Sequence, residues 1–239
     1  MQQELQATAQ PVAPFVMPLI VAPLVASPVA SPAAAVAAGV PLTLVVSDSM
    51  CAGVRDGAIN AMLGEHADTR TQSDHVKVER HLGATADEIR FYSKYNIQKL
   101  RPQRVVIVAG ANDVSREDLN DPDAPATIAH RIGQIAREAK GLGVAEVSVM
   151  GIVLRRDKRY FTIISRVNLA LRYVCSTDGF TYIDNNFIGV GDLQRDGLHV
   201  NYVGKQKLMH NILSCCPSYN PTYGYMWDTL NKWGVNLNC

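Results

Sequence analysis

From residue 41 onwards, short apolar runs rich in β-branched residues alternate with longer amphipathic runs. Five apolar runs read as strands, at residues 42–47, 75–79, 104–109, 145–151 and 180–184. The amphipathic runs predict helices at residues 50–63, 85–99, 125–141, 160–177 and 202–213. Strict alternation of strands and helices implies a parallel sheet with right-handed crossovers. The pattern therefore predicts an α/β domain over residues 41–214, a three-layer α/β/α sandwich around a five-stranded parallel sheet.

The two ends of the chain differ from this domain in amino-acid composition. Residues 5–47 contain no charged side chain, but seven prolines interrupt the segment and argue against a membrane-spanning helix. A signal peptide would begin with a basic region, whereas the first ten residues carry only Glu4. We expect residues 1–40 to be a disordered Ala/Val/Pro-rich tail, with a targeting segment or membrane contact as the alternatives. Residues 215–239, rich in Tyr, Trp and Asn, are expected to wrap the domain or reach a partner.

Charge and cysteine content exclude some classes of function. The chain has 23 Lys and Arg against 22 Asp and Glu, and this near balance gives no strong signal for nucleic-acid binding. The five cysteines show no CxxC spacing, which argues against a zinc site, and we expect no metal. Cys51 and Cys175 read as buried thiols, while Cys215, Cys216 and Cys239 could pair if the protein is secreted. There is no GxGxxG or Walker motif, so no cofactor is predicted, and compartment and oligomeric state stay open.

Polar residues gather where the predicted strands end. The first strand is followed by Ser47-Asp48-Ser49, the second by a loop with Gly83, and the third by GAND at residues 110–113. The motif DGLH at residues 196–199 precedes the last helix. Ligands of open parallel sheets bind beyond the carboxyl ends of the strands, so these junctions are expected to meet at one edge.

Together these residue types make a complete set for acyl transfer. A serine hydroxyl becomes a strong nucleophile only when a base takes its proton, and His199 can act as that base for Ser49. Asp196 can accept the other imidazole N–H and stabilise the imidazolium. The backbone amides of Ser49 and Gly83, with the side-chain amide of Asn112, can donate to a developing oxyanion. For Asp48 and Asp113 we expect structural roles, as helix caps or loop braces.

These four blocks resemble those of the GDSL-type esterase and lipase family, which has the SGNH-hydrolase fold. The resemblance covers residues 42–213 and implies a serine esterase that acts on a small-molecule, glycan or lipid ester. Ser47 stands where the family has the first glycine, a departure that spares the nucleophile. The phrases RPQRVVIVAGANDV and RDGLHVNYVGKQKL further resemble esterase-like domains of invertebrate and retrotransposon-encoded proteins.

Two alternatives stay open from the residues alone. The fold could serve as a binding module, for a ligand or in association with nucleic acid, without turning over a substrate. The second alternative concerns the basic run after the fourth predicted strand. Arg155 and Arg156 either lie in a solvated loop or bind an anionic group of the substrate.

Overall fold

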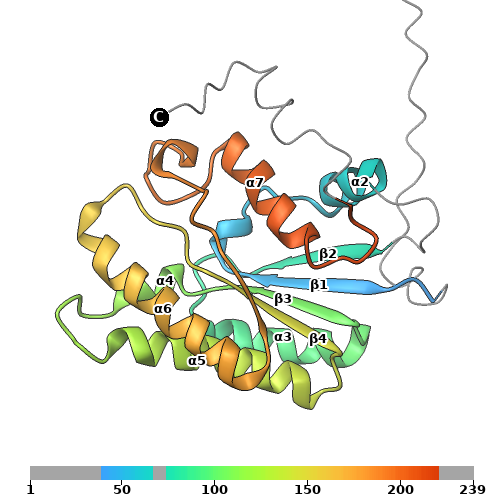
Figure 1. Cartoon of the computed structure of the whole chain (residues 1–239), viewed down its shortest axis with the longest axis horizontal. Helices are drawn as coiled ribbons and strands as arrows, with labels where there is room; N and C mark the ends of the chain where they lie inside the picture. Colours follow the sequence, from blue (N-terminus) through green and yellow to red (C-terminus); the bar gives the residue numbers. More distant parts are fainter. Residues whose placement is uncertain (1–38, 67–73, 221–239) are drawn as a thin grey trace, which may run out of the picture.

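The computed structural model describes residues 39–66 and 74–220, and these build one sheet of five parallel strands (Figure 1). The strands are β1 (Leu42–Ser47), β2 (His75–Arg80), β3 (Arg104–Val108), β4 (Glu146–Met150) and β5 (Thr181–Ile183). Their order across the sheet is β2-β1-β3-β4-β5. The predicted fold class is confirmed. Most of the tail expected at residues 1–40 lies outside the described residues.

Helices cover both faces of the sheet. The longer ones are α2 (Asp56–His66), α3 (Ala86–Leu100), α5 (Ala124–Gly141), α6 (Phe161–Asp178) and α7 (Tyr202–Leu213). A one-and-a-half-turn helix, α4 (Ala111–Arg116), follows β3, and three 3-10 turns are η1 (Ser49–Cys51), η2 (Lys158–Tyr160) and η3 (Val190–Asp192). Helices α2 and α7 lie on one face, and α3, α5 and α6 on the other (Figure 1). This gives the three layers that the alternating pattern predicts.

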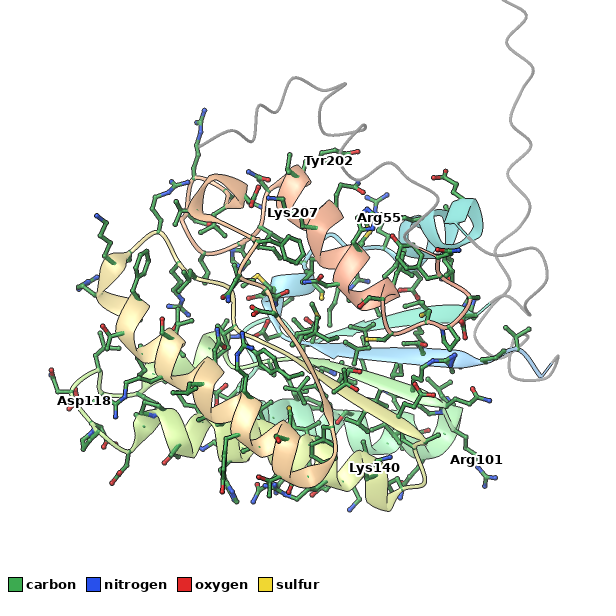
Figure 2. All side chains as sticks on the ribbon, viewed as in Figure 1. Arg55, Arg101, Asp118, Lys140, Tyr202 and Lys207 are labelled. Carbon is green, nitrogen blue, oxygen red and sulfur yellow. The ribbon has the colours of Figure 1, made fainter. Side chains whose placement is uncertain are left out.

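Strand register brings the ends of three strands level with one another. Ser47, the last residue of β1, pairs with Arg80 of β2 and with Val108 of β3. The loops that leave these three strands therefore start side by side. In Figure 2, Arg101 and Lys140 mark the opposite edge, where β3 and β4 begin, while Asp118, beyond α4, lies far from both.

The central strands are buried because helices cover both of their faces. All side chains of β1 and β3 are buried, including the charged Arg104. Arg104 pairs with Asp74 at 2.5 Å, and Asp74 also accepts hydrogen bonds from the backbone and hydroxyl of Ser218. Cys216 and Tyr219 are buried as well. Residues 215–220 therefore pack as part of the domain, while residues 221–239 lie outside the described part of the chain.

One predicted helix begins later than expected. Instead of a helix from residue 50, the chain makes the short turn η1, and α2 starts only at Asp56. Gly53 has a φ of +81°, a left-handed conformation that interrupts a right-handed helix. A Cβ atom at Gly53 would lie 2.7 Å from Nζ of Lys205, so the turn also packs against α7. Because apolar periodicity continues through residues 50–63, the sequence pattern gives no sign of this break.

Candidate active site

Ser49 is the first residue of η1, directly beyond the carboxyl end of β1. It is partly exposed, while Met50 and Cys51 beside it are buried. Within residues 39–66 and 74–220, neither its hydroxyl nor its backbone N–H makes a hydrogen bond. Ser49 therefore presents a hydroxyl and a backbone N–H at the surface, neither of them bonded to another described residue.

Ser47 holds the turn that presents Ser49. Its side chain is fully buried, and its hydroxyl donates to the carbonyl of Asp48 at 3.0 Å and accepts from the amide of Cys51 at 3.3 Å. A buried hydroxyl is tolerated when both its donor and acceptor capacity are used. The serine in place of a glycine thus fits the local structure.

Asp48 ties the loop after β1 to the loop after β3. Its carboxylate accepts from the amide of Met50 at 2.8 Å and from the amide of Ala111 at 3.2 Å. Its own backbone N–H donates to the carbonyl of Val108 at 3.0 Å. Burial raises the pKa of Asp48 to about 6, against the lowering effect of the two amides. Asp48 is therefore both the cap and the brace expected of it.

Asn112 and Gly83 are brought together by a second set of contacts. Asn112 lies in α4, and its Nδ2 donates to the carbonyl of Ala84 at 3.0 Å, next to Gly83. The backbone N–H of Gly83 donates to no acceptor in the part of the chain that the structure describes. Asp113 acts as a brace, since its Oδ2 accepts from the amide of Ala86 at the start of α3, at 2.9 Å. Gly110, not Asp113, is the N-cap of α4.

Gly110 is a steric requirement of this arrangement. Its φ is +107°, and a Cβ atom there would lie 2.7 Å and 2.8 Å from side-chain carbons of Ile152 and Ile132. Neither the backbone conformation nor the space admits a side chain. The glycine therefore allows β3 to turn into α4 close to the core, which places Asn112.

Asp196 and His199 form a pair within one short loop. Asp196 Oδ2 lies 2.7 Å from His199 Nδ1, and Oδ1 accepts from the amides of Leu198 and His199 at 2.9 Å and 3.0 Å. The His199 hydrogen bond is the largest of the causes that lower the pKa of Asp196 to about 2. An antiparallel bridge between Leu193 and Val200 closes the loop. The ionised Asp196 thus fixes the orientation of the imidazole and leaves its Nε2 without a protein partner among the described residues.

Comparison with known proteins identifies the family. Residues 48–207, two thirds of the chain, match the model of the GDSL-like lipase/acylhydrolase family. The chain belongs to this family. The matched span includes Asp48 and Ser49 of the first polar junction and the other three junctions entirely.

Solved structures show the same fold at low sequence identity. A lipase/acylhydrolase from Enterococcus faecalis superposes with a TM-score of 0.61 at 20% identity, covering 73% of this chain and 94% of that one. A catalytic mutant of Axe2, an acetylxylan esterase from Geobacillus stearothermophilus, gives 0.59 at 15% identity, covering 73% and 93%. TesA gives 0.56 at 24% identity, covering 74% and 98%. No curated protein matches the chain.

Within this GDSL-like domain, the two arginines after β4 donate hydrogen bonds to different parts of the site. Arg155 is buried, and its Nη2 donates to the carbonyl of Ala111 and to the hydroxyl of Ser115, at 2.7 Å for the latter. It thus holds α4, the helix that carries Asn112. Arg156 is exposed, and its guanidinium donates to the carbonyls of Arg195 and Gln194 at 3.2 Å and 3.0 Å.

The contacts of the two arginines bear on their predicted role. Because Arg155 is buried rather than solvated, its guanidinium presents little surface to a substrate, and the solvated-loop alternative is wrong for it. Substrate binding by Arg155 and Arg156 stays a prediction. The sequence contains no signal for the bonds they make to α4 and to the loop of Asp196, because the partners, three backbone carbonyls and the hydroxyl of Ser115, are distant in the chain.

Other observations on the described residues bear on the chemistry expected of this site. No hydrogen bond joins Ser49 to His199 in the part of the chain described. Within the same residues, no group of His, Cys, Asp and Glu side chains could hold a metal ion, and no helix is both long and apolar enough to cross a bilayer. Cys51, Cys175, Cys215 and Cys216 are free thiols, and Cys239 lies outside the described residues.

Proposed function

We propose that this GDSL-like domain is a serine esterase that hydrolyses carboxylic esters, of an acetyl or a lipid type. Ser49 Oγ attacks the ester carbonyl carbon while its proton passes to Nε2 of His199. The imidazolium then protonates the departing alcohol oxygen, which leaves an acyl group on Ser49. A water molecule, deprotonated by His199, releases the acid and restores the serine.

The observation that carries this proposal is the oriented His199–Asp196 pair. A histidine acts as a base only in the tautomer whose lone pair faces the nucleophile, and the 2.7 Å bond to Asp196 selects protonation at Nδ1. With the pKa of Asp196 at about 2, the carboxylate stays ionised throughout the neutral range and stabilises the imidazolium.

Three free donors support the oxyanion part of the mechanism. The backbone amides of Ser49 and Gly83 have no acceptor among the described residues. Asn112 gives one amide hydrogen to the carbonyl of Ala84, and its second remains for a ligand. Donors that are held in place before reaction stabilise the developing charge without reorganisation.

A ligand-binding module on the same fold is the second candidate, because Ser49 and His199 are not hydrogen-bonded in this structure. Catalytic hydrogen bonds are often long without substrate and tighten only in the complex, so the esterase is the better supported of the two. The acetylxylan esterase among the structural neighbours supports an acetyl ester of a glycan as one substrate to test.

Incubation with p-nitrophenyl acetate and a fluorophosphonate probe separates these candidates. We expect hydrolysis, and labelling that mass spectrometry assigns to Ser49 rather than to the buried Ser47. Ser49→Ala should abolish both signals while the melting temperature stays near that of the wild type. A folded wild-type protein that neither hydrolyses the ester nor takes up the probe would favour the binding module.

A further inference from the structure

Large apolar side chains cluster at the outer surface of α3. We define the α3 patch as Leu82, Phe91, Tyr92 and Tyr95, four of the ten exposed large hydrophobic residues in the described part of the chain. Their exposed fractions are 72%, 78%, 48% and 64%. These side chains are not part of the core, to which α3 contributes Ile89, Ile97 and Leu100 from its inner face.

Ring contacts join two members of the α3 patch to each other and to the loop after β2. Tyr92 stacks on the ring of His81 with centroids 4.8 Å apart, and Phe91 meets Tyr92 edge-on at 5.5 Å. His81 belongs to the loop after β2, so this stacking holds the loop against α3, and Leu82 is the next, exposed residue of the same loop. Tyr95 follows Phe91 by one helical turn and lies on the same side of the helix. Contiguous exposed apolar surface of this kind marks an interaction site more often than scattered single residues do.

Exposed lysines lie beside this patch, and the nearest carboxylates are already paired. Asp87 and Glu88, one turn before Phe91 and Tyr92, pair with Arg131 and Arg116. Residues 89–101 contain no Asp or Glu, whereas Lys94, Lys99 and Arg101 lie in this stretch; Arg90 is instead paired with Glu138 of α5. Lys99 Nζ is 5.7 Å from the ring centroid of Tyr95, and Lys94 is exposed. Arg101 projects from the end of α3 (Figure 2). The acidic residues of α3 are confined to its first turn, where Glu88 is part of the capping box with Thr85.

We propose that the α3 patch docks the domain onto an anionic lipid surface. Tyr and Phe rings favour the boundary between headgroups and acyl chains, and flanking lysines add attraction to anionic lipids. A nucleic-acid duplex fits less well, because its phosphates are contacted through hydrogen bonds and charges and Leu82 and Phe91 offer neither. Local charge on one face is sufficient for a lipid surface, because only groups within a Debye length of the membrane contribute.

The patch also adjoins the candidate active site. Leu82 immediately precedes Gly83, whose free amide is one of the proposed oxyanion donors. Docking through the patch would bring that loop to the lipid surface. Binding to the lipid surface itself does not depend on catalysis, so it can be tested even if the proposed esterase activity fails.

Vesicle flotation with the full-length protein tests the proposal. We expect binding to phosphatidylcholine vesicles that contain phosphatidylserine, and weaker binding to vesicles of phosphatidylcholine alone or at high salt. The double variant Phe91→Gln with Tyr95→Gln should bind at least about tenfold more weakly, since two rings no longer leave water. Lys94→Glu with Lys99→Glu should lose more than this, since each substitution removes an attraction to the anionic surface and adds a repulsion.

The chain offers a matched control on α6. Leu169 and Tyr173 have the same four-residue spacing and exposed fractions of 69% and 74%. Leu169→Gln with Tyr173→Gln should therefore leave vesicle binding unchanged, and all variants should keep the wild-type melting temperature and p-nitrophenyl acetate hydrolysis.

Several outcomes would overturn the proposal. These are wild-type protein that fails to float, equal binding by the wild type and the Phe91/Tyr95 variant, or an equal loss in the α6 control. If the Phe91/Tyr95 variant instead lost self-association or binding to single-stranded RNA while still floating with vesicles, the patch would serve a second copy or RNA.

Discussion

The two halves of the candidate site each depend on an aspartate, and the two aspartates sit in opposite surroundings. Asp48, beside the proposed nucleophile Ser49, is 1% exposed, and its pKa is raised to about 6. The side chain of Asp196, on the base side, is 46% exposed, and its pKa is lowered to about 2. Both accept hydrogen bonds from two backbone amides.

The difference between them separates burial from hydrogen bonding as causes of a pKa shift. At Asp48, the cost of removing the charge from water exceeds the benefit of the two amides. At Asp196, water still reaches the carboxylate and His199 adds a third hydrogen bond. We infer that Asp48 stabilises the fold around Ser49, whereas Asp196 assists the proton transfer proposed for His199. Four substitutions test this division.

Asp196→Asn should produce the largest effect. Without the carboxylate, the imidazole loses the partner that fixes its tautomer, and kcat should fall by about 10⁴-fold. Because Asp196 lies in an exposed loop, the melting temperature should change little. Steady-state kinetics and thermal denaturation of the same sample check both statements. Near-normal turnover would mean that another group orients His199.

Asn112→Ala removes one proposed oxyanion donor. A donor of this kind contributes roughly 10²–10³ in rate, and the loss should appear in kcat rather than in KM because the charge exists only in the transition state. Both constants should be measured with p-nitrophenyl acetate. If KM alone changed, Asn112 would instead bind the substrate in its ground state.

Asp48→Asn should alter the pH dependence of stability. The folded pKa of about 6 lies above the reference value of 3.8, so the folded state retains a proton that the unfolded state has released. The contribution of Asp48 to stability therefore falls as pH rises from about 4 through about 6. The Asn variant lacks this loss and should gain on the wild type by up to roughly 3 kcal/mol between these pH values.

Urea denaturation of both proteins at several pH values measures this difference. The variant also loses one acceptor for the amides of Met50 and Ala111, but that cost does not depend on pH and shifts the whole curve. If the free energies of unfolding of the two proteins ran parallel with pH, Asp48 would titrate in the ordinary range.

Arg156→Ala should give the smallest effect. Its guanidinium bonds the carbonyls of Gln194 and Arg195 at the surface, so its loss should loosen the loop of Asp196 and His199 and lower kcat by at most about tenfold. Arg159→Ala is the matched control, because that exposed arginine pairs with the nearby Asp157 and lies 6.0 Å from the ring centroid of Tyr160. Arg156→Lys should restore part of the rate. Equal kcat values for both alanine variants would contradict a role for Arg156 in positioning.

The sequence predicts those features that depend on local pattern. Continuous apolar runs such as VVIVA identify buried strands, and β3 occupies Arg104–Val108 within the predicted residues 104–109. The bond between Asp196 and His199 is also local, since only two residues lie between them and both belong to one tight loop. The pattern does not predict the helix break at Gly53 or the short helix α4, because apolar spacing alone does not report backbone conformation.

By itself, then, the sequence determined the α/β/α fold, the order of its elements and the residue types gathered at one edge of the sheet. Only the tertiary structure decided how those residues are held. Asp48 meets the amide of Ala111, 63 residues away, because strand register sets Ser47 beside Val108. Arg155 reaches the carbonyl of Ala111 from the end of β4. Such pairs depend on which strands become neighbours, and the neighbours are chosen by packing of the whole domain rather than by any local segment.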